Sequence, residues 1–339
     1  MRPQVKTIIP AVLDWYDVYG RDLPWRVRGM PHPDAYHVWL SEIMLQQTTV
    51  PAVKPYFEKF TDKYPTVHDL ARASSEDVMR DWAGLGYYSR ARNLHAAAKA
   101  VSAAGGQFPR DKAGLIALPG IGEYTAGAIA AIAFGARTSV VDGNIERILT
   151  RLYAIETPLP ASKPDIKAVA ETLFHADANT RPHDLPQALM DLATAICTPK
   201  APKCVICPIS KQCAAYRLGL QDDLPKRMKK PERPKRKGFV YWVEDDRGRV
   251  LVETRPPKGL LGGMTGLPTS EWNDDPQPLA IFEGAPERSK VKHVFTHFEL
   301  TLIPVRAKVK KTPPGYRFVD PRNAGFPSVF QKVAKYFSA

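Results

Sequence analysis

Apolar residues recur at helical spacing along the chain as far as about residue 220. Trp39, Leu40 and Ile43 share one face of a predicted helix. The Ala-rich stretch 91–104 and the run 125–134 consist mostly of strong helix formers. Pro, Gly and Asp separate these segments. The pattern therefore predicts that the first two thirds of the chain are mainly helical.

The pattern changes in the last third of the chain. The runs 239–243 and 250–252 are rich in β-branched and aromatic residues, and they flank a hairpin signal at 246–248. Residues 291–305 predict two further strands, and 331–337 predict a short closing helix. This part is therefore predicted to be a separate α+β domain.

A basic segment separates the two parts. Residues 224–238 contain eight Lys or Arg residues and three prolines, a composition that cannot bury a core. We assign residues 223–237 to a basic interdomain linker and 238–339 to the α+β domain.

Composition adds a partner class. The 339 residues carry a net charge of +13 with a pI of about 9.5. Such a surplus favours a polyanionic partner, because cations that neutralise phosphates release counterions. No apolar run approaches the length of a membrane span, and residues 1–10 lack the apolar core of a secretory signal. We expect a cytosolic protein, associated with the nucleoid in a bacterium, with no membrane partner.

All four cysteines lie close together. They are Cys197, Cys204, Cys207 and Cys213. A disulfide framework usually spreads its cysteines, so a cluster of thiols in a cytosolic chain favours a metal site. Zinc and iron–sulfur clusters both accept four thiolates, and the spacing alone does not separate them.

Three further segments carry candidate chemistry. Residues 118–122, Leu-Pro-Gly-Ile-Gly, precede a predicted helix whose free N–H groups suit a phosphate. Glu42 falls beside a mainly apolar helix face, with Gln46 one turn later, and apolar surroundings help a carboxyl keep its proton. Asp142 precedes Gly143 at a predicted helix start, a common N-cap pattern.

These strings resemble one superfamily of DNA repair enzymes. The segments 118–129, 39–48 and 140–147 and the cysteine spacing, with Pro208 after the third cysteine, are similar to those of endonuclease III and MutY-type adenine DNA glycosylases. The resemblance implies a mainly α, helix-hairpin-helix glycosylase core with a 4Fe–4S cluster and a Nudix-like C-terminal domain. It divides the core into a six-helix subdomain, 36–135, and a cluster-containing subdomain, 1–35 with 136–222.

The resemblance also implies a reaction. The expected activity is removal of adenine mispaired with 8-oxoguanine or guanine in double-stranded DNA, by a monomer that flips the base out. Glu42 matches the acid that protonates adenine, Asp142 the carboxylate that stabilises the sugar cation, and Asn144 a nearby polar residue. Tyr124 stands where strand-cutting relatives carry a Schiff-base lysine, so the expected enzyme is a monofunctional glycosylase.

Further residues match positions that contact DNA or the flipped base. Gln47 and Tyr87 are the expected wedges that fill the gap left by the base. The complete set of expected contacts in the core is Trp25, Arg26, Gln46, Gln47, Thr48, Leu85, Tyr87, Gly120, Gly122, Asp191, Lys200 and Lys203.

The C-terminal domain resembles a Nudix fold without its catalytic helix. The stretch from Gly259 onward contains Glu271 but lacks the glutamate triad that holds magnesium, so no nucleotide hydrolysis is expected. In MutY-type enzymes this domain senses 8-oxoguanine. Phe295, Thr296 and His297 form the expected sensing loop, by stacking, hydrogen bonding and contact with phosphate or the lesion.

Three other functions fit parts of the sequence. An endonuclease III-like glycosylase and lyase acting on oxidised pyrimidines is disfavoured by Tyr124 and by the extra domain. A Nudix pyrophosphatase fused to a DNA-binding module is disfavoured by the missing glutamates. A non-catalytic DNA-binding protein is disfavoured by the presence of both Glu42 and Asp142.

Overall fold

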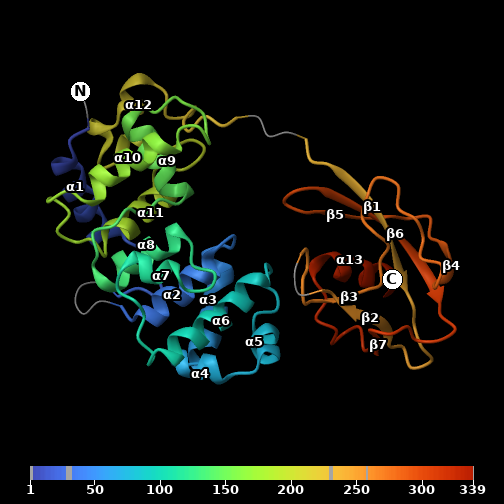
Figure 1. Ribbon diagram of the computed structural model, residues 1–339. Helices are drawn as coiled ribbons and strands as arrows, with labels where there is room; N and C mark the ends of the chain where they lie inside the picture. The colour runs from blue at the N-terminus through green and yellow to red at the C-terminus, as the bar shows by residue number, and fades with distance from the viewer. Residues whose placement is uncertain (1–2, 28–32, 229–231, 257–258, 339) are drawn as a thin grey trace. The chain divides into compact units, whose positions relative to one another are not determined.

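The computed structural model describes residues 3–27, 33–228, 232–256 and 259–338 (Figure 1). The chain forms two compact units. The first contains Met1–Leu85 and Arg90–Lys229, and the second contains Lys230–Ala339 together with Gly86–Ser89. Within the described ranges, no helix has the length and apolar character needed to cross a membrane.

The first unit is helical, as the sequence predicts. Its α-helices are α1 (Val5–Tyr19), α2 (Ala35–Leu45), α3 (Val50–Lys63), α4 (Val67–Arg72), α5 (Ser75–Asp81), α6 (Ser89–Ala103), α7 (Lys112–Ile116), α8 (Glu123–Phe134), α9 (Gly143–Tyr153), α10 (Lys163–Phe174), α11 (Leu185–Ala195) and α12 (Ala214–Leu218). The apolar helices α2 and α8 pack against each other, and α1 packs against α10 and α11. Thus α1, first in sequence, joins helices formed more than 140 residues later (Figure 1).

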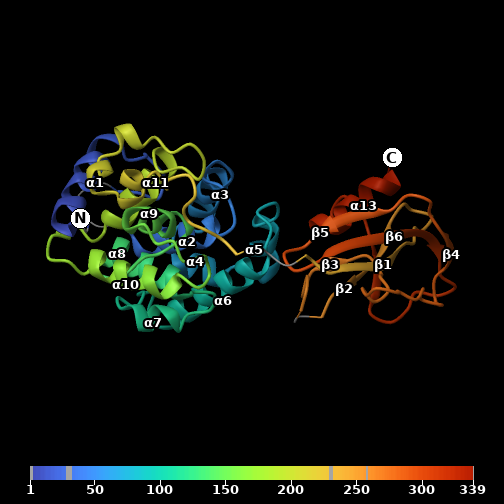
Figure 2. The ribbon, with the colours of Figure 1, turned by 90° about the horizontal axis from the view of Figure 1, so that it is seen from above.

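The second unit combines two small sheets with one helix. The strands are β1 (Lys235–Trp242), β2 (Val250–Thr254), β3 (Thr265–Gly266), β4 (Glu283–Pro286), β5 (Val291–Val294), β6 (Glu299–Lys308) and β7 (Tyr316–Val319), followed by α13 (Ser328–Ser338). β6 pairs in parallel with β1 and antiparallel with β4 and β5, whereas β2 lies between β3 and β7. α13 packs against β5 (Figure 2). Residues of both sheets and of α13 share one apolar core.

The predicted hairpin at 246–248 is only half right. A turn closes there, since the Asp245 carbonyl accepts a hydrogen bond from Gly248. However, β1 and β2 belong to different sheets, and beside the turn their ends are linked by a bridge between Glu244 and Val250 and by a hydrogen bond from the Leu251 N–H to the Val243 carbonyl at 2.9 Å. The two strands do not pair further, because β6 occupies one edge of β1 and the segment with Thr269 and Asn273 forms bridges to the other edge.

The predicted linker, 223–237, is too long at both ends. Leu224 is buried, and the backbones of Leu159 and Lys226 are hydrogen-bonded at 2.9 Å, so this end packs on the first unit. At the other end β1 already begins at Lys235, whose backbone pairs with Glu299. A basic composition predicted a tether, but backbone pairing needs no apolar side chains.

Candidate active site

Two carboxyl-bearing residues from distant parts of the chain meet beside α8. Glu42 lies near the end of α2, and Asp142 is the N-cap of α9. The charge of Asp142 acts on Glu42, and the Tyr124 hydroxyl, from the first turn of α8, donates a hydrogen bond to Glu42. The packing of α2 on α8 therefore brings together three of the residues predicted to carry the chemistry.

Glu42 is held in a protonatable state at neutral pH. Its side chain is buried among the apolar residues of α2, with only 8% of the residue exposed. Burial raises the pKa of Glu42 to about 7, and the charge of Asp142 adds to this, whereas the Tyr124 hydrogen bond and the charge of Arg26 lower the pKa. A carboxyl with this pKa can donate a proton at neutral pH.

Removing the Tyr124 hydroxyl should move the titration of Glu42. In a Tyr124→Phe variant the carboxylate loses a hydrogen bond that favours its charged form. The pKa of Glu42 then rises, and the alkaline fall in the rate of the glycosylase reaction expected from the sequence moves to higher pH by about half to one unit. A single-turnover pH profile measures this shift; a midpoint that stays in place or moves down contradicts it.

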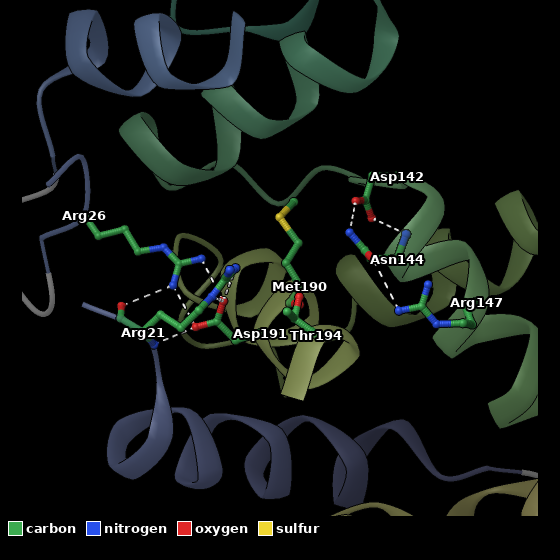
Figure 3. A network of polar contacts seen from close by, with 8 residues as sticks. All are labelled: Arg21, Arg26, Asp142, Asn144, Arg147, Met190, Asp191 and Thr194. Carbon is green, nitrogen blue, oxygen red and sulfur yellow. Dashed lines mark hydrogen bonds and ion pairs between the residues drawn. The ribbon is translucent and has the colours of Figure 1, made fainter. Parts of the chain in front are cut away.

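Asp142 is fixed by the start of its own helix. Its Oδ1 accepts hydrogen bonds from the backbone N–H groups of Asn144 at 3.0 Å and Ile145 at 2.8 Å. Its Oδ2 accepts one from the Asn144 side-chain amide at 2.8 Å (Figure 3). These donors set the orientation of the side chain, and the cap expected from the sequence is present.

Arg147 extends this network toward the cysteine loop. Its Nη2 donates to the Asn144 side-chain oxygen at 3.2 Å (Figure 3). The same atom donates to the Ala193 carbonyl at 2.9 Å. Its Nε donates to the Cys197 carbonyl at 2.7 Å. The sequence analysis did not single out Arg147; its position one turn after Asn144 was the available signal.

A pocket opens beside Glu42. Its wall includes Trp25 and Arg26, as predicted, and also Arg21 and Gln187, which the sequence analysis missed. Its volume is about 50 Å³, room for only a few water molecules, so a flipped purine requires the pocket to widen. Arg21 precedes the Leu-Pro-Trp-Arg string and Gln187 lies one helical turn before Asp191, which were the signals available.

Asp191 does not face this pocket as a free contact. Its carboxylate is 1% exposed, and both oxygens accept hydrogen bonds from Arg21 and Arg26 (Figure 3). In this structure two arginines occupy its oxygens, and the expectation that Asp191 belongs to the base pocket stays a prediction.

The hairpin residues lie on the surface at the start of α8. Gly120 has a φ of +76°, and a Cβ there would lie 2.6 Å from the Asn93 Cβ, so glycine is required. Gly122 is the N-cap and provides no side-chain cap for the first N–H groups of α8. These exposed donors are left without a side-chain cap, and their binding of a phosphate stays a prediction.

The two predicted wedge residues have unusual backbones. Gln47 and Tyr87 are exposed and have φ values of 59° and 48°, in the left-handed region that non-glycine residues rarely adopt. Gln46 is not on the helix, which ends at Leu45; its side chain donates to Thr125 at 3.2 Å. As the C-cap that follows the helical residues 42–45, Gln46 still lies one turn after Glu42, as the sequence predicts.

Leu85 and Thr48 are held by a buried arginine. Arg90 donates to the carbonyls of Ile43 at 2.8 Å and Leu85 at 3.2 Å, and to the Thr48 hydroxyl at 3.3 Å. The Leu85 side chain is only 7% exposed, and a contact of this residue with DNA stays a prediction. Arg90 thereby joins the loop after α2 to the loop that carries Tyr87.

The four cysteines line one cavity. Its other walls are mainly apolar, and Arg151 donates to the Cys197 Sγ at 3.3 Å. Backbone N–H groups donate to the sulfurs of Cys207 and Cys213, and burial raises the pKa of Cys207 to about 12. In the ranges that the structure describes, no group of three or more His, Cys, Asp or Glu side chains is placed so that it could hold a metal ion.

Arg151 closes the cysteine loop from inside. It is fully buried and donates to the carbonyls of Thr198 at 2.7 Å and Pro199 at 3.3 Å, and also to that of Leu224 at 2.9 Å. Between the first two cysteines, Lys200 and Lys203 are exposed, in positions where DNA phosphates could reach them.

The predicted sensing loop connects β5 to β6. Thr296 and His297 are exposed and line a surface cavity with Arg233 and Lys235. Phe295 instead stacks on Trp272, with ring centroids 5.8 Å apart, and packs against the domain core. This position favours a supporting role for Phe295 over stacking on a DNA base.

Comparisons with known proteins match both units. Residues 40–176 match the HhH-GPD superfamily of base excision DNA repair proteins, and residues 239–336 match the NUDIX domain. A solved thermostable thymine-DNA glycosylase is 30% identical, with a TM-score of 0.55 over 63% of this chain and 97% of its own. An endonuclease III–DNA complex shares the fold at 20% identity and a TM-score of 0.51, over 64% of this chain and 99% of its own.

Full-length relatives are more informative. The human adenine DNA glycosylase is 33% identical over 96% of this chain and 72% of its own length. The Arabidopsis thaliana enzyme is 37% identical over 80% of this chain, which spans about half, 49%, of that relative. The adenine DNA glycosylase of Buchnera aphidicola from Schizaphis graminum is 33% identical over 96% of this chain and 97% of its own. The chain therefore belongs to the adenine DNA glycosylase family.

Proposed function

We propose that this protein, as a monomer, excises adenine paired with 8-oxoguanine or guanine in double-stranded DNA and leaves an abasic site. The observation that carries the proposal is the buried Glu42, with a pKa of about 7, beside the fixed carboxylate of Asp142. An acid and a carboxylate are the two groups that cleavage of an N-glycosidic bond requires. The family relationship supplies adenine as the base.

The reaction follows from these two groups. Glu42 gives its proton to a ring nitrogen of adenine, and the electrons of the bond between the sugar C1′ and the base leave with the base. Asp142 stabilises the positive charge on the sugar while water adds to C1′, and the proton of that water returns to a carboxylate. Tyr124 has no amine that could replace water, so we propose that the DNA strand is not cut.

We propose a 4Fe–4S cluster for the cysteine cavity. The donor set fits, since four thiols line one apolar cavity and receive hydrogen bonds from Arg151 and from backbone N–H groups. When bound, the cluster supplies four iron–thiolate bonds that cross-link the loop. Iron, acid-labile sulfide and zinc are measured in the purified protein. Four irons and four sulfides per chain support the proposal, and one zinc per chain overturns it.

We propose that the C-terminal domain reads the base opposite adenine through Thr296 and His297. Both are exposed at the turn between β5 and β6, beside the cationic residues Arg233 and Lys235, which suit a DNA backbone. A threonine hydroxyl can donate to and accept from a modified guanine.

The test measures adenine release from duplexes with adenine opposite 8-oxoguanine, guanine or thymine. Release is expected to be fastest opposite 8-oxoguanine, slower opposite guanine and absent opposite thymine. Thr296→Val keeps the branched shape but removes the hydroxyl, so the preference for 8-oxoguanine over guanine should fall about tenfold. An unchanged preference in this variant would show that Thr296 is not the reader.

The same assay contains the alternatives. Because one similar structure is a thymine-DNA glycosylase, thymine opposite guanine is included, as are oxidised pyrimidines. Borohydride trapping on DNA reports any Schiff base. Release of a pyrimidine without release of adenine would replace the proposal, and efficient trapping would overturn the monofunctional assignment.

A further inference from the structure

Asp191 is a buried acid that the proposed reaction does not use. It lies on α11, and only 1% of its side chain is exposed. Burial raises its pKa, but hydrogen bonds and charges from Arg26 and Arg21 outweigh burial, and the pKa falls below its ordinary value. Asp191 is therefore ionised inside the fold.

Its charge is matched mainly by Arg26. Nη1 and Nη2 of Arg26 donate to separate oxygens of Asp191 at 2.7 and 3.0 Å, the two-point geometry of a strong pair. The Arg26 side chain is itself only 6% exposed. Arg21 adds its backbone N–H and its Nε, each at 2.7 Å (Figure 3).

Arg26 also faces Glu42. Both line the same pocket, and the positive charge of Arg26 acts on Glu42 to favour its ionised form. An unpaired arginine at this place would draw the proton away from the acid that needs it. The Asp191 carboxylate offsets that charge and turns the guanidinium toward α11.

The other groups around Glu42 do not do this. The titratable or charged groups that face it in the described structure are Tyr124 from α8, Asp142 at the start of α9, and Arg26 and Arg21 from the segment after α1. The pocket residues contributed by α11 and α3 are uncharged: Gln187, Met190 and Val50. The net charge of the Arg26–Asp191 pair is therefore the feature of this site that can be changed to shift the titration of Glu42.

We propose that Asp191 is a positioning residue that neutralises Arg26 and so keeps Glu42 protonated for catalysis. The inference rests on the proposed function, in which Glu42 is the acid. It predicts that removing the charge of Asp191 lowers the pH midpoint at which Glu42 titrates. Removing the charge of Arg26 raises that midpoint.

The expected shifts have fixed signs. Asp191→Asn leaves the Arg26 charge unmatched, so the midpoint of Glu42 falls by about one pH unit. Arg26→Gln leaves Asp191 unmatched, so the midpoint rises by a similar amount. The double variant removes both charges and returns close to the wild-type midpoint, and Asp191→Glu, which keeps the charge, also stays close.

Two measurements follow these shifts. Single-turnover adenine release between pH 5 and pH 9 gives the midpoint through the reaction. Below pH 5.5 Asp191→Asn should approach the wild-type rate, and at pH 8 it should be about tenfold slower, since one unit of pKa is a tenfold change. Infrared difference spectra against Glu42→Gln follow the carboxyl of Glu42 directly, without any reaction.

The outcomes are separable. If infrared midpoints are the same in all variants, Asp191 serves only the fold and the inference is wrong. If Asp191→Asn does not fold, Arg26→Gln and the double variant still test the inference. The double variant loses both charges, so no unpaired charge is left beside Glu42. If the midpoints shift as expected but no adenine is released from any duplex, the proposed function fails while the charge balance around Glu42 stands.

Discussion

Replacing Glu42 with glutamine is expected to slow adenine release by roughly a thousandfold, within the range typical for loss of a general acid. Glutamine fills the same volume on the buried face of α2 but has no proton to give at neutral pH. Single-turnover rates on a duplex with adenine opposite 8-oxoguanine measure the loss. Binding of the same duplex should change little, since Glu42 is buried.

The same variant has a stability signature. The folded protein holds the Glu42 pKa at about 7, above the ordinary 4.5, so protonation stabilises the fold at low pH. This contribution is lost as the pH rises from the lower value through the higher one. Glutamine cannot ionise, so between pH 5 and pH 8 the variant should gain roughly 2–3 kcal/mol of unfolding free energy relative to wild type. Denaturant unfolding at both pH values tests this. If the unfolding free energy depends on pH in the same way in both proteins, Glu42 does not have a raised pKa in the folded state.

Replacing Asp142 with asparagine should separate its two roles. Asparagine caps helices as well as aspartate, so α9 keeps its hydrogen bonds from Asn144 and Ile145, and the unfolding free energy should change by less than about 1 kcal/mol. The negative charge that faces the sugar cation is lost, so adenine release should fall by roughly a thousandfold. Rate and unfolding are measured on the same preparations.

A matched control exists at another helix start. Asp111 caps α7 by accepting a hydrogen bond from Gly114 at 2.9 Å. Asp111→Asn makes the same chemical change without touching Glu42 or Asp142, and its release rate should equal that of wild type. If Asp142→Asn is no slower than this control, Asp142 is only a helix cap.

Local patterns predicted the scaffold well, because they depend on neighbours in sequence. The apolar spacing around Trp39 predicts α2, and the Asp-Gly pair predicts the cap of α9. The pairing of Asp191 with Arg21 and Arg26 joins residues about 165 positions apart, and no periodicity encodes it. The inward packing of Phe295 depends on Trp272, which lies in a different segment.

Sequence also failed where the backbone is irregular. The α2 helix ends at Leu45, where Arg90 donates to the carbonyls of Ile43 and Met44, and sequence spacing did not show this end. The sheet partners of β1 could not be read from alternation, since alternation gives a strand its faces but not its neighbours.

The buried guanidinium of Arg151 has a consequence for biosynthesis. Its acceptors come from Thr198 and Pro199 in the cysteine loop and from Leu224, eleven residues after the last cysteine. A ribosome must therefore release the chain beyond residue 224 before this lining can form. A nascent chain paused earlier would display all four thiols on an open loop, where a delivery system or an oxidant could reach them.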